Sequence, residues 1–143
     1  MAIQFNKFTH KTQEAVQRAV EMAMELGHQQ IETEHVTYAL LKLEGGLISD
    51  FLTRFNVSID EILKKLEAEL EKKPSVEGGQ QPFLSSLVNK VFSEAQKIAS
   101  KMKDEYVSQE HVFLALFKEN ETLLSQELKR NGVREEDILG ILK

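Results

Sequence analysis

The chain has 143 residues, 41% of them hydrophobic and 29% charged, with a formal net charge of −5 and no cysteine. This composition is typical of one globular domain, and the negative charge argues against a general electrostatic attraction to nucleic acid or to anionic membranes. Without cysteine there are no disulfides and no thiolate metal sites, and no stretch approaches the roughly 20 apolar residues of a membrane span.

The first predicted helix begins at Thr9, a residue type that caps helix N-termini well, and Phe8 before it is apolar. Gly27 is a natural stop, because glycine adopts the left-handed conformation that commonly ends a helix. Between them, apolar residues recur at the spacing of one helix face: Val16, Ala19, Val20, Ala23 and Leu26.

The next helix opens with TEHVTYALLK, residues 33–42, and we expect Thr33 to be its N-cap. Gly45 and Gly46 then favour a turn, and a short helix follows at about 47–55. Asn56 tolerates the left-handed conformation, so it is expected to end that helix. A fourth helix completes the first half of the chain.

The stretch KKPSVEGGQQPF interrupts the helical pattern. It contains Pro74, Gly78, Gly79 and Pro82, which disfavour a helix, and we interpret residues 73–82 as a linker.

The second half repeats the first at an offset of 76 residues, since QEHVFLALFK at 109–118 matches 33–42. Its first helix is expected to start near Ser85, and its second helix after the N-cap Ser108. A short helix is expected at about 123–131, and Gly132 is equivalent to Asn56. We therefore predict an all-α fold of two tandem four-helix repeats, about 5–72 and 83–143, packed as one pseudo-two-fold symmetric domain over residues 1–143. The matched positions include Glu34, His35, Val36, Ala39, Leu40 and Lys42 with Glu110, His111, Val112, Ala115, Leu116 and Lys118.

Motifs for catalysis, metals and nucleotides are missing from the sequence. The four histidines, His10, His28, His35 and His111, form no H-E-x-x-H pattern, and neither a G-x-S-x-G elbow nor a phosphate loop occurs. The Glu-His pairs at 34–35 and 110–111 do not face each other, because neighbouring helical residues point about 100° apart. We expect a non-catalytic chain that binds no metal and no cofactor.

Glu34 and Glu110 allow two interpretations. Each falls in the first turn of a helix, where the helix dipole stabilises a carboxylate by about 0.3–1 kcal/mol. Alternatively, the two acids capture cationic or polar groups of a partner. Position and chemistry favour the first interpretation but leave the second open.

The apolar stripe of the fifth helix also allows two interpretations. Most of Val88, Val91, Phe92 and Ile98 must be core, yet a groove between two packed units could hold an extended or helical peptide. Phe5, Phe8 and Phe83 flank helix starts and could line or cover such a groove.

The pattern FTHKTQEAVQRAVEMAMELGHQQIETEHVTYALL, the repeated EHV-x-x-AL and the following EGGLI resemble the N-terminal domain of Clp-type AAA+ proteins. The connector PSVEGGQQPFLSS looks most like the ClpB disaggregase branch. The resemblance implies a domain that engages unfolded or aggregated polypeptide, carried by a hexameric, cytoplasmic ATPase whose remaining chain binds ATP and Mg²⁺. The alternative is an adaptor-docking domain of a ClpC- or ClpA-type protease-associated unfoldase.

The resemblance also implies site residues. Thr9, Asp104 and Glu110 match polar positions implicated in substrate handling in ClpB, and Val88 and Phe92 are the best matches to a nearby apolar groove. In the ClpC branch, the acids that match Glu34 and Glu110 are implicated in recognising phosphorylated arginine.

Overall fold

Helices make up almost all of the regular structure in the computed structural model, which describes residues 3–44, 47–78 and 81–142. Two short parallel strands, β1 (Gln30–Ile31) and β2 (Phe83–Leu84), are the exception, so the predicted all-α class is confirmed. The α-helices are α1 (His10–Glu25), α2 (Thr33–Leu41), α3 (Leu47–Arg54), α4 (Ile59–Glu71), α5 (Ser86–Lys101), α6 (Gln109–Lys118), α7 (Leu123–Arg130) and α8 (Glu135–Leu139), with 3₁₀ turns η1 (Phe5–Lys7) and η2 (Gly140–Leu142).

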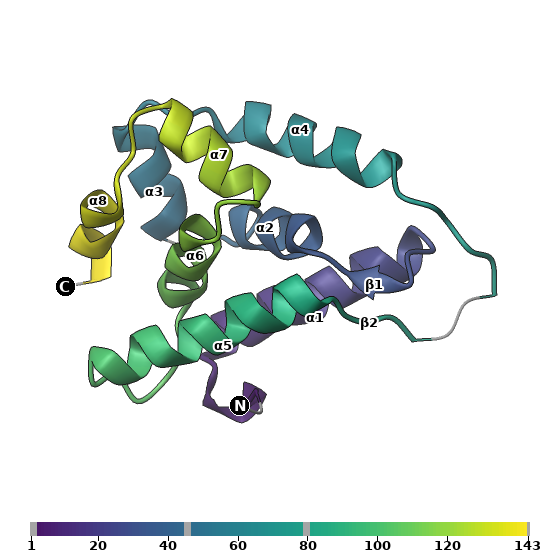
Figure 1. Cartoon of the computed structure of the whole chain (residues 1–143), viewed down its shortest axis with the longest axis horizontal. Helices are drawn as coiled ribbons and strands as arrows, with labels where there is room; N and C mark the ends of the chain where they lie inside the picture. The colour runs from purple at the N-terminus through teal and green to yellow at the C-terminus, as the bar shows by residue number, and fades with distance from the viewer. Residues whose placement is uncertain (1–2, 45–46, 79–80, 143) are drawn as a thin grey trace.

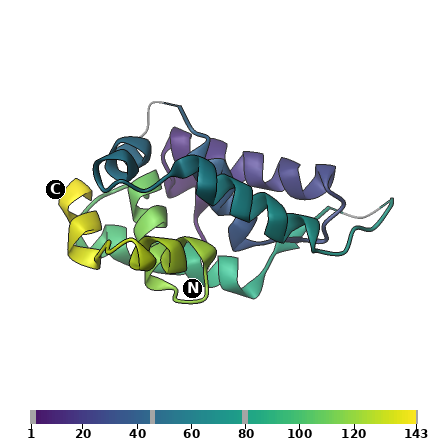
Figure 2. The same ribbon diagram turned by 90° about the horizontal axis from the view of Figure 1, so that it is seen from above.

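The eight helices form two equivalent sets, because each helix from α5 to α8 begins 76 residues after its counterpart among α1 to α4. Helices α2 and α6 lie at the centre and contact each other, while α1 packs on α2 and α5 packs on α6 (Figure 1). Seen from above, the first and second units occupy opposite halves of the molecule (Figure 2). Gly45, Gly46 and Gly79, for which we predict a turn and part of the linker, lie outside the described residues.

The segments that precede α1 and α5 each form backbone hydrogen bonds with a segment of the other unit. Before α5, the Ser85 N–H donates to the Ile31 carbonyl across 3.1 Å, and before α1 the Thr9 N–H donates to the Val107 carbonyl across 2.9 Å. Donors and acceptors of these two bonds are each 76 residues apart. The bridge between Phe8 and Val107 thus repeats the β1–β2 pairing. These equivalent hydrogen bonds join the two units with pseudo-two-fold symmetry.

Residues with positive φ end several helices where the sequence predicts it. Gly27, Asn56 and Gly132 have φ angles of 72°, 57° and 79°. Lys103, at the position equivalent to Gly27, also has a positive φ, 60°. The sequence gives no indication of it, because lysine is not a residue type that favours this conformation.

The predicted caps are correct at Thr9, Ser85 and Ser108, whose hydroxyls accept from backbone N–H groups three residues later. The prediction for Thr33 is wrong by one residue, since the N-cap of α2 is Glu32. There the Glu32 N–H donates to His35 Nδ1 across 2.8 Å, so a histidine ring takes part in the cap that a threonine hydroxyl was expected to make.

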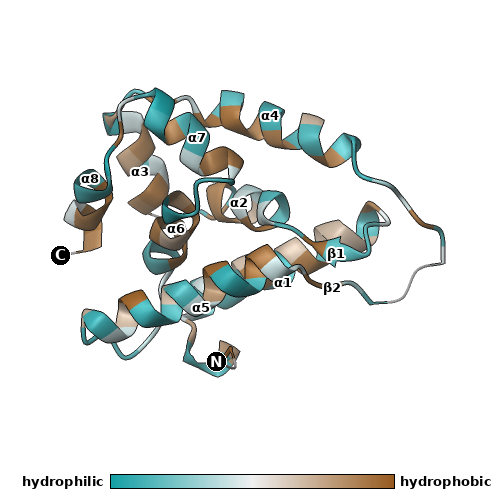
Figure 3. Cartoon of the chain, in the orientation of Figure 1, coloured by the Kyte–Doolittle hydropathy of each residue, from teal (hydrophilic) through white to brown (hydrophobic). Residues whose placement is uncertain are grey.

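One continuous core joins the two units. Every residue of α6 from His111 to Phe117 is buried, as expected of a helix surrounded by others. The outer helices α4 and α5 instead show hydrophobic residues at helical intervals among hydrophilic ones (Figure 3). This apolar core accounts for the stability of helices that are too short to persist alone.

The linker packs closely on Gly27, which yields a first prediction. A Cβ atom at Gly27 would lie 2.5 Å from Ser75 Oγ, whereas one at Gly132 would meet no atom within 4 Å. Both glycines have positive φ, so Gly132→Ala is expected to cost about 1 kcal/mol of unfolding free energy and Gly27→Ala about 2–3 kcal/mol. Urea denaturation measures both values. Equal losses would show that contact between Gly27 and the linker does not contribute.

Candidate functional site at the start of helix α6

The polar residues Thr9, Asp104 and Glu110 gather around the segment that leads into α6. Thr9 is joined to this segment by its backbone bond to Val107. Asp104 accepts a hydrogen bond from His111 Nε2 across 2.9 Å, and Glu110 lies one residue before that histidine, half-buried in the first turn of α6. The structure therefore brings these three predicted residues to one region.

The Asp104 carboxylate forms a hydrogen bond with His111 and is also accessible to solvent. The Ser108 N–H donates to His111 Nδ1 across 2.8 Å, so the ring proton is on Nε2 and is donated to the Asp104 carboxylate. His111 is buried, but the Asp104 side chain remains 46% exposed. This carboxylate orients the histidine of the α6 cap and can still reach a partner.

Thr9 likewise has a local role. Its hydroxyl accepts from the Thr12 N–H across 3.2 Å and lies 2.7 Å from the Thr12 hydroxyl. Thr9 is half-buried, and it caps the α1 N-terminus as expected of its residue type.

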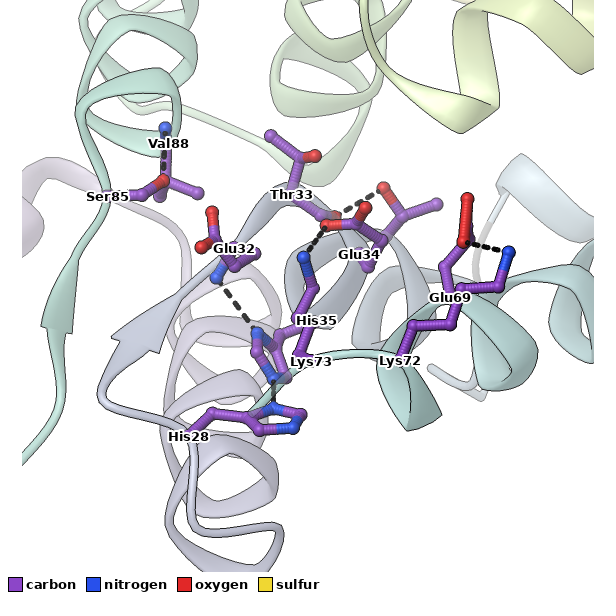
Figure 4. Close-up of polar contacts among 11 residues, drawn as sticks. His28, Glu32, Thr33, Glu34, His35, Glu69, Lys72, Lys73, Ser85 and Val88 are labelled. Carbon is purple, nitrogen blue, oxygen red and sulfur yellow. Dashed lines mark hydrogen bonds and ion pairs between the residues drawn. The ribbon is translucent and has the colours of Figure 1, made fainter. Parts of the chain in front are cut away.

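The equivalent region of the first unit differs in its chemistry. His35 Nε2 donates to His28 Nδ1 across 2.9 Å, so a second histidine occupies the position that Asp104 has in the second unit (Figure 4). Burial, and then the neighbouring His28 and Lys73, lower the pKa of His35 to about 4. Burial, and then Lys73, also lower the pKa of His28.

The two first-turn acids also differ. Glu34 forms an ion pair with Lys73 at the end of α4, with 3.7 Å between Nζ and the carboxylate (Figure 4). Glu110 has no ion-pair partner within the described part of the chain, and the buried Oε1 of its neighbour Gln109 has no hydrogen-bond partner. Of the two first-turn acids, Glu110 is therefore the one whose carboxylate can bind an external group.

A groove of about 830 Å³ lies beside Asp104, with the C-terminal half of α5 forming much of its lining. Its floor includes the buried residues Ile98, Ala99 and Val107. Charged side chains of both signs surround it: Lys7, Glu94, Lys97, Lys101, Glu105 and Lys118.

Val88 and Phe92 belong to the core in this structure. Both have 0% exposure, so neither side chain lines the surface of the groove. Phe92 is covered by the rings of Phe5 and Phe8, each with its centroid 5.7 Å away. Phe5, which the sequence suggested could line or cover a groove, is partly exposed, and so is Tyr106, two residues after Asp104.

Neither a metal site nor a membrane span is found in the described ranges. No three histidine, aspartate or glutamate side chains come together there in a way that could hold a metal ion. Among the described helices, none combines the length and the apolar character needed to cross a bilayer.

Fold and site together define a duplicated helical domain with an accessible acidic site beside a groove. Residues 7–131 match the family described as the Clp repeat (R) N-terminal domain, and the chain belongs to this family. A similar curated relative is the chaperone protein ClpB of Nitratidesulfovibrio vulgaris, 37% identical over 142 residues. That alignment covers 96% of this chain but only 16% of the relative, so the chain spans about one-sixth of that protein's length.

Solved structures share the fold. The Hsp104 N-terminal domain of Candida albicans superposes with a TM-score of 0.79 at 22% identity, over 92% of this chain and 86% of that one. A complex of a ClpV N-domain with a VipB peptide superposes with a TM-score of 0.75 at 16% identity, over 94% and 83% of the two chains.

Proposed function

We propose that this chain is the non-catalytic, substrate-engaging N-terminal domain of a ClpB-type ATP-dependent disaggregase. It binds unfolded or aggregated polypeptide at the face formed by Thr9, Asp104, Glu110 and the adjacent groove. The ATP- and Mg²⁺-binding parts belong to the rest of a cytoplasmic, hexameric AAA+ chain, and neither nucleic acid nor membrane is a partner.

The observation that carries the proposal is the accessible Asp104 carboxylate, which lines a groove of about 830 Å³. Glu110, half-buried and without an ion pair among the described residues, follows it in the first turn of α6. Exposed backbone N–H groups and cationic side chains of an unfolded segment suit such carboxylates, and the apolar floor suits its aliphatic side chains. Support comes from the ClpB relative, which is called a chaperone, and from the ClpV N-domain of the same fold that was solved with a peptide.

Weak binding is expected from this surface. Burial of a few hundred Å² contributes at roughly 25 cal/mol/Å², but the cost of ordering an unfolded segment offsets much of it, so dissociation constants should be micromolar or weaker. Several copies on one ring would add avidity.

The proposal predicts that Glu110 contributes to binding more than to stability. Glu110→Ala should lower the unfolding free energy by less than about 1 kcal/mol, because only the helix dipole is involved, yet weaken binding of a permanently unfolded model protein. Glu34→Ala is the matched control, since Glu34 is already paired with Lys73 and should leave binding unchanged. Denaturation and NMR titration provide the two measurements.

The same titration locates the site. NMR signals around Thr9, Asp104 and Glu110 should shift on addition of the unfolded protein, and shifts confined to the opposite face would contradict the proposal. Stoichiometric binding of one folded adaptor, without competition from unfolded chains, would instead favour the ClpC- or ClpA-type alternative.

A further inference from the structure

The N-terminal segment of residues 4–7 separates two hollows on the molecular surface. Gln4 and Lys7 line the groove of about 830 Å³ beside Asp104. Phe5 and Asn6 line a second hollow of about 600 Å³ along the first half of α1. The segment thus contributes residues to both hollows and lies between them.

Beneath this segment lies a cluster of aromatic rings. The Phe5 ring meets Phe92 edge-on, at 85° between planes with centroids 5.7 Å apart, and lies 5.2 Å from Phe8. Phe8 and Phe92 are completely buried, but Phe5 is 37% exposed. Phe5 therefore acts as the cover of a buried aromatic pair.

At its end the cover is tied to the second unit, because the Val107 N–H donates to the Lys7 carbonyl across 2.8 Å, but the polar contacts near Phe5 are exposed. The Gln4 N–H donates to Gln96 Oε1 across 2.7 Å, and Gln13 Nε2 donates to the Phe5 carbonyl across 3.1 Å, both at exposed positions. The 3₁₀ turn η1 buries none of its own residues. Exposed hydrogen bonds and a half-covered ring are easily exchanged for equivalent contacts with another chain.

We propose that residues 4–7 occupy the place of a ligand, and that the ligand is an extended polypeptide segment with an aromatic side chain. Such a segment displaces Phe5, sets its own ring on Phe92 and Phe8, and lies along the two hollows. This inference rests on the proposed function and deepens it, because it names the kind of segment that the face selects.

The geometry favours an aromatic side chain over an aliphatic one. Phe8 and Phe92 are themselves edge-on, at 81° with centroids 5.7 Å apart, so they offer a ring face and a ring edge to a third ring. Aromatic pairs in these arrangements gain more than their buried area provides. An aliphatic side chain would fill part of the space without that gain.

The first test compares labelled, unstructured ten-residue peptides that differ only in one central residue: phenylalanine, leucine or alanine. Fluorescence anisotropy measures their affinity for the 143-residue chain. Phe5→Ala should tighten the phenylalanine peptide about two- to tenfold, because the internal competitor has lost its ring. Phe83→Ala is the matched control, since Phe83 is 59% exposed at the equivalent bridge of the other unit, and it should change nothing.

The second test locks the cover. Because the chain has no cysteine, Gln4→Cys/Gln96→Cys can be joined specifically by a reducible bismaleimide linker. The locked chain should bind the phenylalanine peptide more weakly than the same chain after reduction of the linker, which carries the same two half-linkers and is therefore the control.

The outcomes separate the two proposals. Tight binding of all peptides by the locked chain, with no effect of Phe5→Ala, overturns displacement of the cover but leaves the proposed function intact. Binding that is equal for the phenylalanine and leucine peptides overturns the aromatic preference. If no variant binds any unfolded peptide or protein, both proposals fail.

Discussion

Phe92→Ala is expected to lower the free energy of unfolding by about 3–5 kcal/mol, one of the largest effects of a single substitution in this chain. The Phe92 side chain is completely buried, and it contacts the rings of both Phe5 and Phe8. Its removal leaves a cavity under η1 and at the bridge that ties the N-terminal segment to the second unit. Domains of this size are stable by only about 5–15 kcal/mol, so the loss would be a large part of the total.

Chemical denaturation checks this value against two other variants. Phe92→Leu keeps most of the apolar volume and should cost less than about 1.5 kcal/mol, and Phe83→Ala, at an exposed position, less than about 1 kcal/mol. A loss below about 1 kcal/mol for Phe92→Ala would contradict the packing seen here. It would mean that the ring is already exposed in solution with η1 lifted.

The sequence predicts the architecture well because the helices of both repeats begin and end at residues whose conformational preferences are local. The left-handed residues Gly27, Asn56 and Gly132, and the caps Thr9 and Ser108, act over a few residues, and each is correctly placed. The sequence does not reveal that the segments before α1 and α5 pair with the other unit. Backbone pairing such as that of Phe8 with Val107 depends on how the units dock, and it leaves no periodicity in the sequence.

The candidate site residues came from the family resemblance and not from local signals. Thr9, Asp104 and Glu110 come together because two of them precede or open α6 and the third is joined to the same segment. The apolar stripe of α5 predicted that most of Val88, Val91, Phe92 and Ile98 are core, which the structure confirms. The stripe alone could not show whether Val88 and Phe92 also line a groove. The difference between Glu34 and Glu110 was also hidden, because it depends on Lys73 at the distant end of α4.

The two histidine caps have different partners, and this difference should make the first unit sensitive to acid. His35 lies among buried groups with His28 and the Lys73 cation nearby, which hold its folded pKa at about 4, below the ordinary value of 6.5. At pH 7 the ring is mostly neutral in both states, so it changes the free energy of unfolding little. As the pH falls below 6.5, His35 is protonated in the unfolded chain but stays neutral in the folded chain. The free energy of unfolding therefore falls continuously until the folded ring also titrates near pH 4.

We therefore expect the free energy of unfolding to fall by about 2 kcal/mol between pH 7 and pH 5 from His35 alone, with His28 adding to the loss in the same direction. Urea denaturation at several pH values gives the slope. His28→Asp copies the partner that His111 has in Asp104, and a carboxylate beside His35 favours the charged ring, so this variant should flatten the slope whatever its stability at pH 7. His10→Gln, at an exposed position of α1, should leave the slope unchanged. A steep slope that persists in His28→Asp would show that the acid sensitivity arises elsewhere in the chain.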